Sequence, residues 1–134
     1  MSAQPAIEKV YVFPHSVGEV YAAWVSSATV IAPATRMEVR AEVGGPYRLY
    51  MDIGDDEIYC AGTFSVVEPQ TRIVYTWQWQ GEDERTTITV GFAEHPDGCA
   101  VALHHDGFQT AASHARHAQG WERYAAGFAA HLQG

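Results

Sequence analysis

The chain has 134 residues and a mass of 14.7 kDa, a size typical of one domain, and we expect residues 1–134 to form a single domain. Hydrophobic residues make up 47% of the sequence and charged residues 18%, which excludes a disordered protein. Eight basic residues stand against sixteen acidic ones, for a net charge of −8. This balance argues against a nucleic-acid partner and against a polybasic membrane contact.

Cysteine use and the N-terminus indicate the compartment. The two cysteines, Cys60 and Cys99, form no CxxC pair, so neither a disulfide framework nor a zinc finger is predicted. Both lie in strand patterns, as small buried apolar residues do. The N-terminal sequence MSAQP has no leader pattern, and no apolar run approaches the ~20 residues that cross a bilayer. We therefore expect a cytoplasmic protein without membrane contact.

The first predicted elements are a strand and a short helix. Residues 7–13 alternate in a pattern rich in β-branched and aromatic side chains, which predicts a strand. Ser16 and Glu19 have the spacing of a capping box, and the apolar residues that follow predict a helix over 17–25. The small residues of 26–35 predict an irregular connection.

Alternation with a period of two then predicts six further strands separated by short turns. From residue 36 onward, apolar residues from Met37 to Val43 alternate with charged residues, which predicts a strand with one apolar face and one charged face. The acidic runs at 55–57 and 82–84 fall in turns, where we expect solvated side chains. The expected strands are 36–43, 47–52, 58–67, 72–80, 86–93 and 99–105.

Residues 110–132 return to helical spacing, with a stripe of aromatic and small residues from His114 to Leu132. Gly120 and Gly127 lie in this segment. Because each glycine costs on the order of 1 kcal/mol relative to alanine in a helix, we expect both to be closely packed. The predicted order is a strand, a helix, a six-stranded antiparallel meander and a long helix, which is an α+β protein.

Three motifs, taken with this order of elements, carry a family resemblance. They are VGGPYRL at 43–49, IVYTW at 73–77, and HDGF at 105–108 followed by GWE at 120–122. The chain resembles the START-like (SRPBCC, helix-grip) superfamily over its whole length. It is most similar to the branch named after the activator of the heat-shock chaperone ATPase. The resemblance implies a curved antiparallel sheet wrapped around the long C-terminal helix, with a cavity between them.

Aromatic and histidine side chains are the candidates for lining such a cavity. One strand face carries three of the aromatic residues and one helix face carries another three. Indole N–H and phenol O–H groups there would orient an apolar ligand, and the alternative is that these residues are simply core. The predicted ligand-binding residues are Tyr75, Trp77, Trp79, His105, His117, Trp121, Tyr124 and Phe128.

Charged and metal-ligating residues give weaker signals. His114 and His117 have the i, i+3 spacing that permits metal ligation. The resembled family, however, often has histidines at the positions of His105 and His117 without a metal. We therefore predict hydrogen-bonded histidines at the cavity rim, no metal and no cofactor. Arg40 and Arg48 either hold an anionic ligand group or form surface ion pairs.

Members of the resembled family differ widely in role, so three functions stay open. The first is binding of a small apolar or aromatic molecule in the cavity. The second is a protein-interaction domain of the co-chaperone type. The third is a cofactor-free cyclase or hydrolase that uses His105 or His117 as general acid and base. We also expect a homodimer formed through helix or sheet faces, because mixed charges on the hairpin of residues 36–52 disfavour edge pairing.

Overall fold

The computed structural model describes residues 4–133. Over these residues the sheet and the helices have the following bounds: β1 (Ile7–Phe13), α1 (Val17–Trp24), β2 (Ala34–Val39), β3 (Pro46–Ile53), β4 (Asp56–Glu68), β5 (Arg72–Trp79), β6 (Thr86–His95), β7 (Gly98–Asp106) and α2 (Ala111–Gln133).

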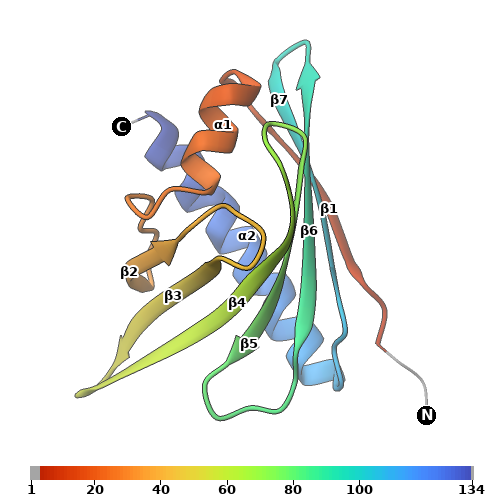
Figure 1. Cartoon of the computed structure of the whole chain (residues 1–134). Helices are drawn as coiled ribbons and strands as arrows, with labels where there is room; N and C mark the ends of the chain where they lie inside the picture. Colours follow the sequence, from red (N-terminus) through yellow and green to blue (C-terminus); the bar gives the residue numbers. More distant parts are fainter. Residues whose placement is uncertain (1–3, 134) are drawn as a thin grey trace.

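The strands form one antiparallel sheet with the order β1-β7-β6-β5-β4-β3-β2. The sheet curls around α2, and α1 lies beside the C-terminal end of that helix (Figure 1). This arrangement confirms the predicted α+β helix-grip fold. Within the described range, neither helix is both long and apolar enough to cross a membrane.

The pairing of β4 with β5 is irregular at one point. The register of this pair shifts between Phe64 and Val66, as it does at a β-bulge. Close by, a Cβ atom on Gly62 would collide with the backbone of Thr76. Glycine is therefore required at this point, because it lets the two strands approach closely while the sheet curves.

One predicted strand is wrong in its extent. Residues 36–43 were expected to continue as a strand, but β2 ends at Val39, and Val43 is 69% exposed rather than on an apolar face. The backbone turns here, with the Arg40 N–H donating to the Pro46 carbonyl at 2.9 Å. A Cβ atom on Gly45 would collide with the Arg40 carbonyl, so this tight loop requires glycine.

The core lies between the inner face of the sheet and the two helices. Trp24 of α1 is at its centre, stacked on Trp121 of α2 with ring centroids 6.2 Å apart.

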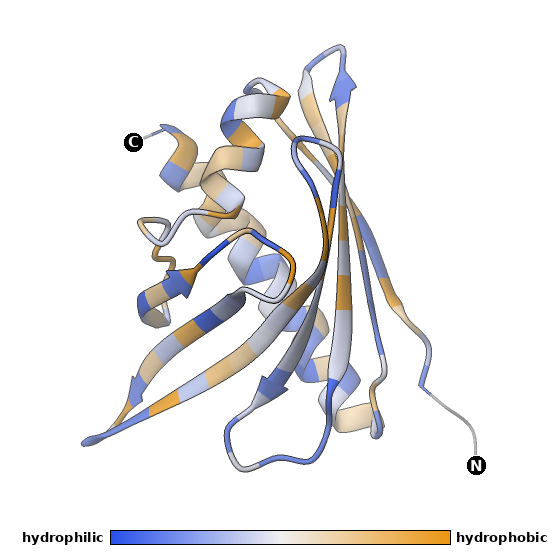
Figure 2. Cartoon of the chain, viewed as in Figure 1, coloured by the Kyte–Doolittle hydropathy of each residue, from blue (hydrophilic) through white to orange (hydrophobic). Residues whose placement is uncertain are grey.

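Ser16 accepts a hydrogen bond from the Glu19 N–H at 3.1 Å, which confirms the predicted start of α1. The loops that join β4, β5 and β6 are hydrophilic (Figure 2). As predicted, Cys60 and Cys99 are buried free thiols.

Candidate functional site

A cavity of about 460 Å³ lies between the inner face of the sheet and α2. Its apolar walls come from β3, β4, β5 and α2, and residues 31–33 border it. The inner faces of β3 and β4 contribute aliphatic side chains that the sequence reasoning did not select, namely Leu49, Met51, Ile53 and Ile58. Concave, mostly apolar spaces of this size are typical of small-molecule sites.

Seven of the eight predicted site residues line this cavity: Tyr75, Trp77, Trp79, His105, His117, Trp121 and Tyr124. The eighth, Phe128, does not. Its side chain is 0% exposed and packs edge-on against Phe13 and Trp24, each with ring centroids 5.1 Å away. The predicted stripe on the last helix therefore divides into a cavity wall and a core contact.

His105 lies in a chain of hydrogen bonds from α2 to the sheet. The Trp121 indole N–H donates to His105 Nδ1 at 2.9 Å, so the ring proton must reside on Nε2, which donates to Thr86 Oγ1 at 2.7 Å. Thr86 in turn donates to the Trp77 carbonyl at 3.0 Å. Burial first, and nearby His117 second, lower the pKa of His105 to about 3, so its ring is neutral.

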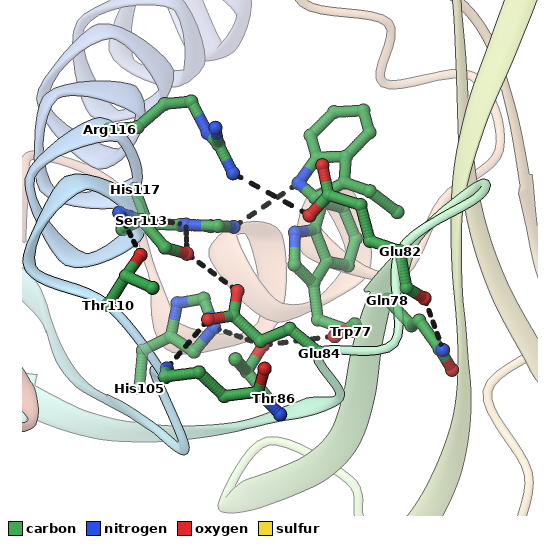
Figure 3. Close-up of polar contacts among 12 residues, drawn as sticks. Trp77, Gln78, Glu82, Glu84, Thr86, His105, Thr110, Ser113, Arg116 and His117 are labelled. Carbon is green, nitrogen blue, oxygen red and sulfur yellow. Dashed lines mark hydrogen bonds and ion pairs between the residues drawn. The ribbon is translucent and has the colours of Figure 1, made fainter. Parts of the chain in front are cut away.

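His117 has a second chain of the same kind, shown in part in Figure 3. The Trp79 indole N–H donates to His117 Nε2 at 3.2 Å, and Nδ1–H donates to the Ser113 carbonyl at 2.8 Å. The Ser113 hydroxyl then donates to Glu84 at 2.6 Å, and the same carboxylate accepts from the Gln109 N–H at 2.7 Å. Burial lowers the pKa of His117, so this ring too is neutral.

Glu84 corrects one prediction. Its place in the turn at 82–84 suggested a solvated tip, but its carboxylate holds the start of α2 through Gln109 and Ser113. Burial alone would raise the pKa of Glu84, but these two hydrogen bonds together lower it. The turn curls back over the helix start, a long-range contact that local sequence does not encode (Figure 3).

These two chains of hydrogen bonds limit what the histidines can do chemically. In His105 and in His117 one ring nitrogen accepts from an indole and the other donates to an oxygen. Each ring nitrogen therefore has a protein partner, and a substrate would have to displace one of these partners before the ring could act as general acid or base. The arrangement instead fixes the tautomer and orientation of each ring, and it ties α2 to β5, β6 and β7.

Three phenols lie in the cavity wall. Tyr47 stacks on Tyr75 with centroids 4.4 Å apart, and Tyr124 faces both from α2. Burial raises the pKa of Tyr47 to about 12 and holds those of Tyr75 and Tyr124 well above their usual values. All three are therefore neutral O–H groups, able to donate to or accept from a polar atom of a ligand. Tyr47 was not among the predicted site residues, because the sequence predicted its strand but not which side chains of that strand face the cavity.

The two glycines of α2 differ. A Cβ atom on Gly127 would collide with Ile31, which confirms the expected close packing there. The same expectation is wrong for Gly120, where a Cβ atom would meet nothing within 4 Å. Gly120 lines the cavity between Arg116 and Arg123, two further residues that the sequence reasoning did not select. The absence of a side chain at Gly120 keeps this stretch of the cavity open.

The remaining polar candidates lie away from the cavity. Arg40 and Arg48 form the surface ion pairs that were one of their two predicted roles, with Glu42 at 3.6 Å and Glu38 at 3.7 Å. His114 packs against the ring of Phe108. In the part of the chain that the structure describes, no three histidine, cysteine, aspartate or glutamate side chains are grouped to hold a metal ion.

Comparison with known proteins places this geometry in a family. Residues 14–133 match the family described as Activator of Hsp90 ATPase homolog 1-like protein. No curated protein gives a significant match by sequence.

Several solved structures share the fold at low sequence identity. Protein CV1439 from Chromobacterium violaceum is 20% identical, with a TM-score of 0.84 over 96% of this chain and 98% of that one. An AHSA1-like protein from Aeromonas hydrophila is 21% identical, with a TM-score of 0.80 over 96% of this chain and 92% of that one. DynU16, from the dynemicin biosynthetic locus, is 18% identical, with a TM-score of 0.79 over 96% of this chain and 47% of that one.

Proposed function

The chain belongs to the family of Activator of Hsp90 ATPase homolog 1-like proteins, within the START-like superfamily, and from that premise we propose that its cavity binds a small apolar or aromatic molecule without a cofactor. The protein acts in this proposal as one domain in the cytoplasm, and the bound molecule lies between the strand face of Trp77 and the helix face of Trp121.

The observation that carries this proposal is the cavity of about 460 Å³, with aromatic side chains on opposite walls. A space of this size is within the range of small-molecule sites, roughly 300–1,000 Å³. Aromatic walls favour a planar apolar ligand, because ring faces and edges pack on it with little loss of side-chain entropy. The neutral phenols of Tyr47, Tyr75 and Tyr124 supply the few polar groups that orient such a molecule.

Filling the cavity tests the proposal. The neutral probe N-phenyl-1-naphthylamine should bind the folded protein, brighten on binding and accept energy from the cavity tryptophans. Gly120→Leu places a side chain in the open space at Gly120 and should weaken probe binding at least about tenfold, since ligand and leucine compete for the same volume.

The matched control is Ala126→Leu, which puts the same side chain on an exposed position of α2. This variant should bind the probe as the parent protein does, and circular dichroism should show both variants folded. Equal binding by the two leucine variants, or no binding by the parent protein, would overturn the proposal.

Of the alternatives, cyclase or hydrolase chemistry with a histidine as general acid and base gains no support, because every ring nitrogen of His105 and His117 is already engaged.

A protein-interaction role has one observation in its favour. On the outer face of β1, at the edge of the sheet, Val10 is 69% and Val12 42% exposed.

A second copy of this chain is the partner that we propose for this outer face. Apolar side chains on one face of a dimer meet the same patch of the other copy. Light scattering at high concentration should then give twice the monomer mass of 14.7 kDa, and Val10→Glu should return it to the monomer. A monomer at every concentration would remove this candidate.

A further inference from the structure

We infer that the ligand of this cavity is an aromatic acid: a planar apolar body between the tryptophans, with one anionic group at the cavity mouth beside Gly120, between Arg116 and Arg123. The inference rests on the proposed function and specifies the chemical class of the molecule that the cavity takes.

The helix geometry brings these three residues to one face. Gly120 is four residues after Arg116 and three before Arg123, the spacings that place side chains on the same face of a helix. All three residues line the cavity. Because nothing lies within 4 Å of a Cβ position on Gly120, a ligand group can reach the helix there, about one helical turn from Arg116 and from Arg123.

The pairing of the basic residues singles out Arg123. Six of the eight basic residues of the chain form ion pairs with carboxylates, and Arg85 donates to the Gln78 side chain at 3.5 Å. Arg123 alone has no carboxylate within ion-pair distance and no side-chain hydrogen bond to any of residues 4–133, and it borders the cavity. Glu122, its neighbour in the chain, contacts Lys9 and Tyr11 instead, so the Arg123 guanidinium can pair with an anionic group of a ligand in the cavity.

The other charges at the mouth agree with this assignment. Glu82 also lines the cavity, but it lies 3.7 Å from Arg116, whose charge it balances. The mouth therefore keeps one unbalanced positive charge. His105 and His117 do not add to it, because both rings are neutral. A guanidinium binds a carboxylate or a sulfonate through two parallel N–H donors. An ester or an alcohol has no negative charge and cannot form this charged, paired contact.

The test compares two fluorescent probes with the same carbon skeleton. 8-Anilino-1-naphthalenesulfonate differs from N-phenyl-1-naphthylamine by one sulfonate group. At low salt the sulfonate should bind the parent protein roughly three- to tenfold more tightly than the neutral probe, an advantage that 0.5 M salt (on the order of a 4 Å Debye length) reduces. Arg123→Gln should remove this advantage and leave the neutral probe unchanged. Arg85→Gln, at an arginine that does not line the cavity, should change neither.

The outcomes separate this inference from the proposed function. If the neutral probe binds and Gly120→Leu weakens it, but the sulfonate gains nothing, the acid class is wrong and the proposed function stands. A sulfonate advantage that persists in Arg123→Gln would also overturn the inference, because the anion would then lie elsewhere. If neither probe binds the parent protein, the proposed function itself fails.

Discussion

Replacing Trp121 with alanine is expected to lower the free energy of unfolding by about 3–5 kcal/mol, the usual cost of truncating a large aromatic side chain in a core. Trp121 stacks on Trp24 and meets Tyr124 edge-on, so the change opens a void beside the existing cavity. It also removes the donor to the buried Nδ1 of His105. Urea unfolding followed by circular dichroism measures the loss.

Trp121→Phe separates the two contributions, because it keeps an aromatic ring and deletes the indole N–H. We expect it to cost about 1–3 kcal/mol, the penalty for leaving a buried acceptor without its donor. A loss below about 1 kcal/mol for Trp121→Ala would contradict the role given to this side chain. It would mean that Trp121 neither packs in the core nor holds His105.

Mild acid should destabilise the protein, because two of its histidines are buried with lowered pKa values. Burial lowers the pKa of His105 to about 3 from an ordinary value of 6.5, and the pKa of His117 is lowered as well. Below about pH 6.5 the unfolded chain therefore binds protons that the folded chain does not, and stability falls as pH falls. For His105 alone the loss is about 2 kcal/mol between about pH 7 and pH 5. His117 adds to it in the same direction.

Urea unfolding at a series of pH values checks this slope, and His105→Gln is the matched variant. A glutamine amide can still accept from Trp121 and donate to Thr86, but it does not titrate. The variant should be less stable than the parent at pH 7 and lose less on going to pH 5. An equal loss in both proteins would show that His105 is charged in the fold or exposed to water.

The elements of the fold and their order could be predicted almost completely from the sequence, because their signals are local, whereas the wrapping of the sheet around the last helix was implied by the family resemblance. Side chains alternate along β5, where Ile73, Tyr75, Trp77 and Trp79 share the inner face as expected, and turn residues separate the strands. The error at residues 40–43 arose because alternation continues past the end of β2. A contact across the loop, from Arg40 to Pro46, turns the backbone there.

The candidate site could be predicted only in part. Periodicity assigned residues such as Trp121 and Tyr124 to the inner side of α2, but it cannot distinguish a core position from a cavity wall. For this reason Phe128, which lies in the core, was predicted to line the cavity. Gly120, which lines the cavity, was expected to be closely packed. The roles of the histidines depend on indole donors from distant elements, which no local spacing reveals.

The central claim is that the space between sheet and helix holds an apolar molecule, and anomalous diffraction from crystals grown with 1-bromonaphthalene tests it most directly. The claim predicts a bromine peak inside the cavity, between Trp77 and Trp121 and near Gly120, and no such peak in crystals of Gly120→Leu. A cavity without bromine in the parent protein, or bromine only on the outer face of the sheet beside Val10, would contradict it.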